Sequence, residues 1–167
     1  MSIFYPHYRY KRIYDIPLDF FISNNIKSII LDVDNTLTTH GNPVPSENVE
    51  QWLDTMRQNN IKMMIVSNNK PKRVKPFAQL LKLDFVANGA KPLVYGIKRA
   101  ASIMQSDIKH TALIGDQIFT DILGGRLSGC ITILVEPIEL EKNWFIKLKR
   151  IFEKMILKKY NSKGAAK

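Results

Sequence analysis

The apolar residues of the chain gather in short runs that are separated by longer polar and amphipathic stretches. Four runs rich in β-branched residues stand out: IKSIILDVD (26–34), IKMMIVSN (61–68), TALIGD (111–116) and CITILVEP (130–137). A shorter fifth candidate is DFVA (84–87). Because these runs are almost continuously apolar, they predict strands that are buried on both faces, as in parallel sheets.

Helical patterns fill the stretches between these runs. Ser46 is a candidate N-cap for a helix that continues to about residue 59. Pro71 and Pro92 suit the first turns of two further helices, and IFTDILGGRLSG (118–129) predicts a fourth that ends at glycine. Strands and helices alternate at a period of roughly 25 to 35 residues, which predicts an α/β fold with a doubly wound, Rossmann-like parallel sheet.

The length and composition fit one folded domain. The chain has 167 residues, of which 45% are hydrophobic, and its single cysteine is Cys130. This length allows one sizeable core, and one cysteine gives no disulfide framework. The N-terminus lacks the apolar segment of a signal peptide, and no apolar run approaches the ~18 residues of a membrane span. We therefore expect a cytoplasmic protein.

The charge is large and uneven. The chain carries 25 basic and 15 acidic residues, a formal net charge of +10. From Lys142 to Lys167 there are nine basic residues and one acidic residue, Glu153. Such a balance favours an anionic partner, either nucleic acid or an anionic membrane surface, and composition alone leaves both open.

Polar side chains follow the predicted strands at the points where they end. They are Asp32 and Asp34, Ser67 with Asn68 and Asn69, Lys91, and Asp116 with Asp121 nearby. In a parallel sheet the ligand binds beyond the carboxyl ends of the strands, so one crevice would collect these groups. Two carboxylates spaced i and i+2 share a face and repel each other unless a cation neutralises them. The pattern predicts a Mg²⁺ site beside a bound phosphate.

These residues resemble the four motifs of haloacid dehalogenase-like (HAD) phosphohydrolases. Asp32-Val33-Asp34-Asn35-Thr36 is similar to the D-x-D-x-T motif, and Ser67, Lys91 and Gly115-Asp116 with Asp121 match the other three in order. More narrowly, LDVDNTLT, VSNN, AKP and GDQIFTD resemble the YqeG-type branch, which includes phosphatidylglycerophosphate phosphatases.

The resemblance implies a role for each matching residue. Asp32 is expected to be the nucleophile that forms an aspartyl-phosphate, and Asp34 the acid and base, with its main-chain carbonyl on the metal. Ser67 and Lys91 are expected to hold the transferred phosphoryl group. The resemblance also implies the residues around Mg²⁺ and the substrate. Those around Mg²⁺ are Asp32, Asp34, Asp116 and, through a water or a hydrogen bond, Asp121, and those around the substrate are Thr36, Asn68 and Asn69.

The spacing between the motifs leaves no room for a cap domain. One helix and one strand fill residues 36–67, and one helix and a short strand fill 67–91. We therefore expect a single capless domain with an open site, which suits a substrate that is large or fixed to a surface.

The chain divides into three segments: a basic and aromatic segment (1–25) packing on the core, the phosphatase core (26–137), and a basic amphipathic helix with a tail (138–167). Within the last, Trp144, Leu148, Ile151, Phe152, Met155 and Ile156 fall at helical spacing, and most of Lys147, Lys149, Arg150, Lys154 and Lys158 lie elsewhere. This pattern is typical of an interfacial membrane helix, although a helix that packs on the sheet or on a partner subunit shows it too. Lys70, Lys72, Arg73 and Lys75 add a basic rim near Ser67.

The hypothesis that joins these observations is a Mg²⁺-dependent phosphatase acting on phosphatidylglycerophosphate, peripheral on the inner face of the membrane. Two alternatives stay open: the same chemistry on a nucleic-acid or protein phosphate, and a non-catalytic module that binds anions or nucleic acid. The residue pattern leaves the oligomeric state undefined.

Overall fold

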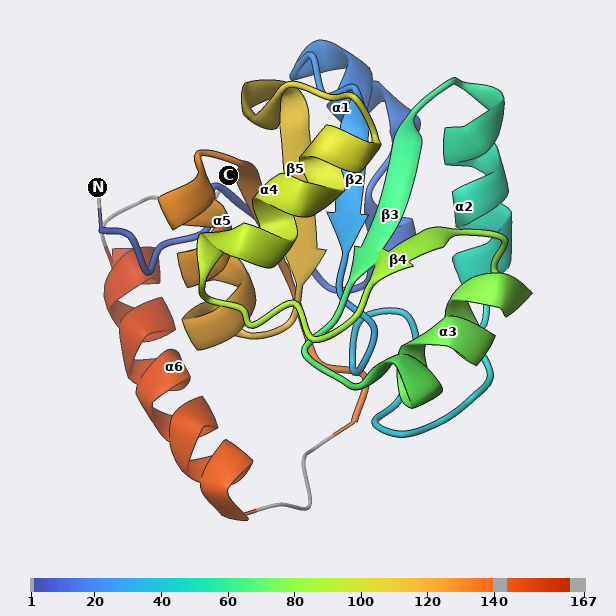
Figure 1. Ribbon diagram of the computed structural model, residues 1–167. Helices are drawn as coiled ribbons and strands as arrows, with labels where there is room; N and C mark the ends of the chain where they lie inside the picture. The colour runs from blue at the N-terminus through green and yellow to red at the C-terminus, as the bar shows by residue number, and fades with distance from the viewer. Residues whose placement is uncertain (1, 140–143, 163–167) are drawn as a thin grey trace.

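One parallel sheet organises the computed structural model, which describes residues 2–139 and 144–162 (Figure 1). The strands lie in the order β1-β6-β5-β2-β3-β4, and every pairing is parallel. Their bounds are β1 Tyr8–Tyr10, β2 Ser28–Leu31, β3 Lys62–Val66, β4 Asp84–Val86, β5 Thr111–Gly115 and β6 Ile131–Val135. The predicted Rossmann-like parallel sheet is confirmed, and all five predicted strands are present.

The sheet has a sixth strand that the sequence analysis did not predict. Tyr8 to Tyr10 pair with Ile133 to Val135 at one edge of the sheet. The backbone N–H of His7 donates to the carbonyl of Thr132 (3.0 Å), and the N–H of Thr132 donates to Nδ1 of His7 (2.9 Å). The N-terminal segment therefore belongs to the sheet itself.

Helices cover both faces of the sheet, so it is doubly wound. Apolar residues of α1 (Leu18–Ser23), α2 (Val49–Gln58) and α3 (Pro71–Leu80) pack on one face with Ile29 and Leu31 of β2. On the other face α4 (Val94–Ile103) packs on Ile30 and Met64. There α5 (Leu123–Ser128) lies beside α4, after a π-helical turn, η3 (Ile118–Ile122). Two short 3₁₀ helices complete these connections: η1 (Ile13–Asp15) and η2 (Ile108–His110).

Two of the predicted helix starts are wrong. α2 begins at Val49, after Asn48 in a left-handed conformation (φ 67°), because the chain from Ser46 first makes a turn in which the Ser46 carbonyl accepts from Val49 N–H. Pro92 precedes α4, whose N-cap is Leu93. The other two boundaries are confirmed: α3 starts at Pro71, and α5 ends at Gly129 with φ 86°.

The C-terminal helix α6 (Trp144–Ser162) lies along the side of the molecule, next to α5 (Figure 1). Ile156 and Leu157 pack against Ile118 and Leu134, and Tyr160 contacts the ring of Tyr5 edge to face, with centroids 5.3 Å apart. Within the described residues, no helix has both the length and the apolarity needed to cross a bilayer.

No cap domain is present within residues 2–139. Only α2 and β3 lie between Thr36 and Ser67, and only α3 and β4 lie between Ser67 and Lys91. The carboxyl edge of the sheet is therefore not covered by an inserted domain.

Candidate active site

Three neighbouring strands bring the predicted site residues together. Asp32 follows β2, Ser67 follows β3 and Asp116 follows β5, and these strands are adjacent in the sheet. Asp32 and Ser67 line one small polar pocket with Asp34, Asn68, Asn69 and Lys91, and the sequence analysis did not foresee its further members His40, Gln117 and Thr120. Asp116 is buried beside Asp32. Thr36 is buried next to this pocket in the turn after Asp34, where its N–H donates to the carbonyl of Val33.

Lys91 lies at the centre of the site. Its side chain is buried, and Nζ is 2.6 Å from Oδ1 of Asp32 and 2.6 Å from Oδ1 of Asp121. Burial alone would lower the pKa of Lys91, but the two carboxylates outweigh burial and hold this pKa above its usual value. The lysine is therefore a fixed positive charge beside Asp32.

Three carboxylates form a tight cluster. Asp32, Asp116 and Asp121 each place one oxygen within 4.8 Å of the others. Burial raises the pKa of Asp32 to about 7; the neighbouring Lys91 opposes this shift and Asp121 adds to it. Burial also raises the pKa of Asp116 well above its usual value. So much buried negative charge calls for a cation.

The cluster has the properties of a Mg²⁺ site. Oδ1 of Asp116 is buried and has no hydrogen-bond partner among the described residues, and Asp116 places one carboxylate oxygen within 4.8 Å of an oxygen of Asp32 and of Asp121. Hard oxygen ligands of this kind suit Mg²⁺. The side chain of Asp34 is not part of the cluster. The contact of its main-chain carbonyl with the metal stays a prediction.

Asp34 is held by residues of the next loop and helix. Its carboxylate accepts hydrogen bonds from Nδ2 of Asn69, from Nη2 of Arg73 (3.1 Å) and from the N–H of Gly41 (3.1 Å). The sequence analysis placed Arg73 in a basic surface rim. The structure turns it inward because it lies in the first turn of α3, directly after the loop that carries Ser67.

Asn68 uses its side chain to hold the loop of Lys91. Its Nδ2 donates to the carbonyl of Lys91 (2.9 Å), and its Oδ1 accepts from the N–H of Lys91 (2.7 Å). Ser67 Oγ accepts from the N–H of Asn69 (3.2 Å). Direct contacts of Asn68, Asn69 and Thr36 with substrate stay predictions.

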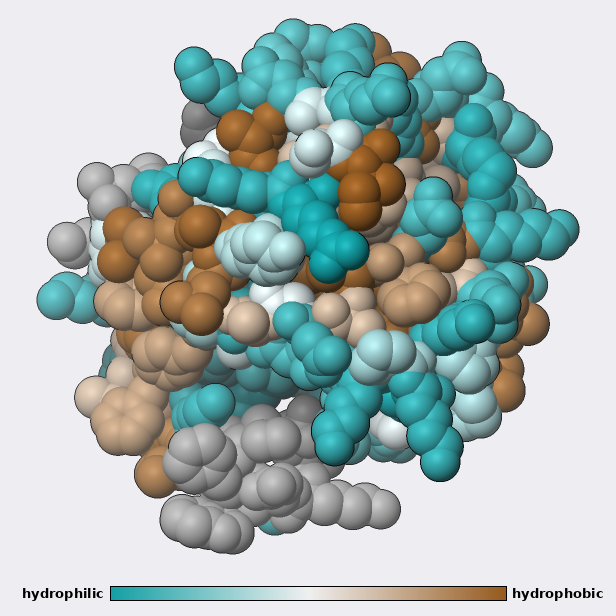
Figure 2. Space-filling view, viewed as in Figure 1, coloured by the Kyte–Doolittle hydropathy of each residue, from teal (hydrophilic) through white to brown (hydrophobic). Residues whose placement is uncertain are grey.

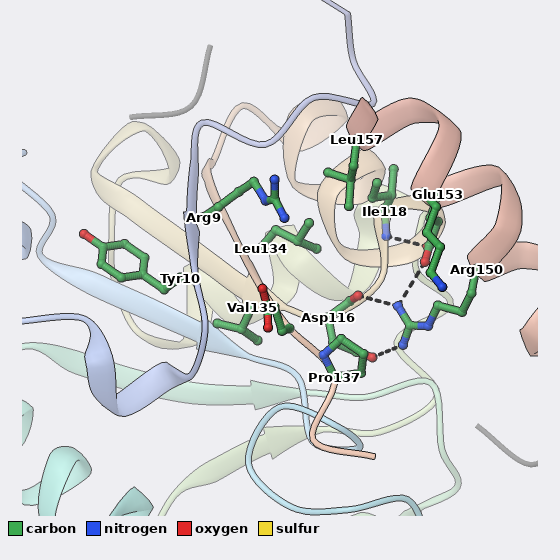
Figure 3. A pocket seen from close by; sticks show the side chains of 12 residues that line it. Arg9, Tyr10, Asp116, Ile118, Leu134, Val135, Pro137, Arg150, Glu153 and Leu157 are labelled. Atoms are coloured by element: carbon green, nitrogen blue, oxygen red, sulfur yellow. Dashed lines mark hydrogen bonds and ion pairs between the residues drawn. The ribbon is translucent and has the colours of Figure 1, made fainter. Parts of the chain in front are cut away.

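Arg150 of α6 reaches the carboxylate cluster, which the sequence analysis missed (Figure 3). Its guanidinium forms an ion pair with Asp116, donates to the main-chain carbonyl of Asp116 (2.6 Å) and donates to Glu153 (2.9 Å). Glu153 is buried and accepts from the N–H of Ile118 (2.7 Å). The available signal was Glu153 itself, the single acidic residue of a strongly basic helix.

A parallel sheet with carboxylates gathered at its carboxyl edge is the arrangement of hydrolases of the HAD-like class. The family model described as mitochondrial PGP phosphatase matches residues 1–79, and the model described as HAD-hydrolase-like matches residues 89–137. The chain is 35% identical to "Probable phosphatase YqeG" of Bacillus subtilis (strain 168) over 163 residues, which are 98% of this chain and 95% of that protein. It therefore belongs to the HAD phosphatase superfamily, in the family of YqeG.

Solved structures agree on the fold. NagD from Escherichia coli K-12 superposes with a TM-score of 0.58 at 13% identity, over 69% of this chain and 90% of that one. The cobalt-bound deoxy-D-mannose-octulosonate 8-phosphate phosphatase YrbI from Haemophilus influenzae superposes with a TM-score of 0.52 at 17% identity, over 81% of this chain and 89% of that one. At this level of identity the likeness concerns the fold alone. The family shows that the protein is a phosphatase.

Proposed function

We propose that the protein is a Mg²⁺-dependent phosphatase that hydrolyses phosphatidylglycerophosphate to phosphatidylglycerol at the cytoplasmic face of the membrane. The observation that carries the chemistry is Asp32, which shares Lys91 with Asp121 and belongs to the three-carboxylate cluster. The match to the mitochondrial PGP phosphatase family model supports the lipid substrate. The chemistry at Asp32 and the lipid substrate can be tested separately.

In the first step the Asp32 carboxylate attacks the phosphorus of the phosphomonoester. A P–O bond forms to Asp32, the bond to the leaving alcohol breaks, and Asp34 gives that alcohol its proton. Bound Mg²⁺, held by Asp32, Asp116, Asp121 and the main-chain carbonyl of Asp34, would supply positive charge beside the phosphoryl oxygens. Lys91 and Ser67 hold those oxygens from the protein side.

In the second step a water molecule hydrolyses the aspartyl-phosphate. Asp34, now ionised, takes a proton from the water, whose oxygen attacks phosphorus and releases Asp32 and inorganic phosphate. Asn69 and Arg73 hold the carboxylate of Asp34 through hydrogen bonds, so it keeps its direction through both steps.

The open carboxyl edge supports a substrate that is anchored elsewhere. HAD phosphatases with a cap cover a small substrate, but the connections around this site hold only α2, α3 and their strands. A phosphate on a lipid headgroup is held by the bilayer, so it needs no enclosure by the protein.

Phosphate release from phosphatidylglycerophosphate in mixed micelles with Mg²⁺ tests the proposal. Wild type should release phosphate, Asp32→Asn should not, and Asp54→Asn, on the exposed side of α2, should behave like wild type. Hydrolysis of a generic aryl phosphate that depends on Asp32, without release from the lipid, would redirect the search to nucleic-acid or protein phosphates. No Mg²⁺-dependent turnover of any phosphomonoester would instead support a non-catalytic module.

A further inference from the structure

The two faces of α6 have different surroundings. The inner face carries Arg150, Glu153 and Tyr160, all in contact with the rest of the protein. The outer face carries four large apolar side chains, which we call the outer stripe: Leu148 (42% exposed), Ile151 (57%), Phe152 (52%) and Met155 (63%). The sequence analysis left open whether these residues pack on the protein's own sheet, and the structure shows that they do not.

The outer stripe is continuous along the helix. Its members are spaced i, i+3, i+4 and i+7, so they fall on one side of α6 over two turns. Figure 2 shows hydrophobic side chains gathered on the left flank of the molecule, over α6 and the adjoining α5. The side chain of Trp144, predicted to extend the stripe, lies outside the described part of the chain.

Lysines flank the outer stripe. By helical geometry Lys147, Lys154 and Lys158 run along one side of it and Lys159 continues its line one turn beyond Met155, and all four are exposed. Glu153 is the one acidic residue in the sequence of α6, and its side chain is buried against η3. The outer face therefore presents apolar groups and positive charge together.

We propose that the outer stripe of α6 docks on an anionic phospholipid bilayer, with its apolar side chains at the headgroup boundary and the lysines on lipid phosphates. The proposal rests on the proposed function, because a lipid substrate requires the enzyme to work at such a surface. Charge complementarity favours the bilayer over a second copy of the chain, since pairing two outer faces would bring rows of lysines together. Nucleic acid would use the lysines but leave the apolar stripe in water.

Co-sedimentation with phosphatidylcholine vesicles, with and without phosphatidylglycerol as the anionic lipid, tests the docking. Wild type should bind the anionic vesicles, and Phe152→Glu should weaken binding at least tenfold, on the order of 1.4 kcal/mol. Ile22→Glu changes another exposed apolar residue, on α1 (61% exposed), and should bind like wild type. Lys147→Glu with Lys158→Glu should remove the preference for anionic vesicles.

Three results would overturn the docking: equal binding of wild type and Phe152→Glu, a Phe152→Glu change from dimer to monomer with vesicle binding intact, or tight RNA binding without vesicle binding. Hydrolysis of a soluble aryl phosphate separates this proposal from the proposed function. Phe152→Glu should keep that activity, because the residue lies outside the site. A protein that binds vesicles and hydrolyses nothing would sustain the docking and defeat the proposed function.

A different observation carries a second inference, on the inner face. Arg150 is paired with Oδ2 of Asp116 and with its main-chain carbonyl, while Oδ1 of Asp116 is buried without a partner among the described residues. Asp116 is also a member of the carboxylate cluster. Glu153 holds Arg150 and is itself fixed by the N–H of Ile118 (Figure 3). The geometry points to Arg150 as a positioning residue that directs Oδ1 of Asp116 towards the metal.

Calorimetric titration of Mg²⁺ into the protein without substrate tests this role. Arg150→Gln and Arg150→Lys should both bind Mg²⁺ at least tenfold more weakly than wild type, because a lysine cannot hold the side chain and the carbonyl together. Arg99→Gln, an exposed arginine on α4, should bind like wild type. Tighter Mg²⁺ binding by the Arg150 variants would show that Arg150 competes with the metal, and unchanged binding would show no role. If Arg150→Gln does not fold, Arg150→Lys decides.

Discussion

Nζ of Lys91 lies 2.6 Å from an oxygen of Asp32 and 2.6 Å from an oxygen of Asp121, and so joins the proposed nucleophile to a proposed metal ligand. Lys91 comes from the loop before α4, Asp32 from the end of β2 and Asp121 from η3. One buried ammonium thus holds three separate segments at the carboxyl edge of the sheet. The same contact that prepares the chemistry also stabilises the fold around it.

Replacing Lys91 by methionine should therefore damage both activity and stability. Without the ammonium, Asp32 and Asp121 are buried carboxylates with no compensating charge, and breaking a buried pair in this way costs about 3–5 kcal/mol. Urea unfolding in the absence of metal measures the loss, and Lys98→Met on the exposed side of α4 is the matched control. Equal free energies of unfolding for both variants would contradict this account.

Gly115 should prove essential for a steric reason. A Cβ at this position would overlap the carboxylate and Cβ of Asp121, so any side chain displaces a member of the cluster. We expect Gly115→Ala to lose most phosphatase activity and to bind Mg²⁺ more weakly, with the sheet intact by circular dichroism. Wild-type Mg²⁺ affinity in Gly115→Ala would mean that Asp121 does not contribute to the metal site.

The strands of the core were predictable because each is a nearly continuous apolar run. β1 was not, since Tyr8, Arg9 and Tyr10 show neither a long run nor apolar alternation, and the strand forms only because β6 offers a free edge. The local signals for helix starts were right at Pro71 and wrong at Pro92. Pro71 starts α3 where its fixed φ suits a first turn, whereas the loop at Pro92 is set by the contacts of Lys91.

The side chains at the strand ends were predictable because topology alone brings them together. Arg73 and Arg150 were not, because basic residues on amphipathic helices usually face water and their partners lie far away in the sequence. Arg150 meets Asp116 across 34 positions, and Arg73 meets Asp34 across 39. Such contacts depend on how α3 and α6 dock, which the periodicity of either helix does not specify.

Removal of the metal should lower the stability of the protein. The carboxylate cluster repels itself in the folded state, and Mg²⁺ would bind the folded chain but not the unfolded one, raising the free energy of unfolding by about 2.7 kcal/mol at a hundredfold excess over Kd. Thermal unfolding with Mg²⁺ and with EDTA measures the difference. Asp116→Asn should reduce this gain, and an equal gain in that variant would place the ion elsewhere.

His7 links the N-terminal strand to β6 and is surrounded by donors. The N–H of Thr132 donates to Nδ1 (2.9 Å), and the guanidinium of Arg126 faces Nε2. Burial, reinforced by the charge of Arg126, lowers the pKa of His7 to about 4. The ring is therefore neutral in the folded protein at pH values where the unfolded chain, with an ordinary histidine pKa near 6.5, already binds a proton.

Mild acid should for this reason loosen the edge of the sheet. Below pH 6.5 the unfolded state binds more protons at His7 than the folded state, so the free energy of unfolding falls as the pH drops towards 4. The contribution of His7 to the free energy of unfolding is complete above pH 6.5 and is lost as the pH falls from 6.5 to about 4. His7→Gln, which cannot be protonated, should lose less stability than wild type between pH 7 and pH 4.5. Urea unfolding of both proteins across this range gives the difference, in which the other titrating groups cancel. If the free energies of unfolding of the two proteins fell in parallel as the pH drops, His7 would be protonated as readily in the folded protein as in the unfolded one.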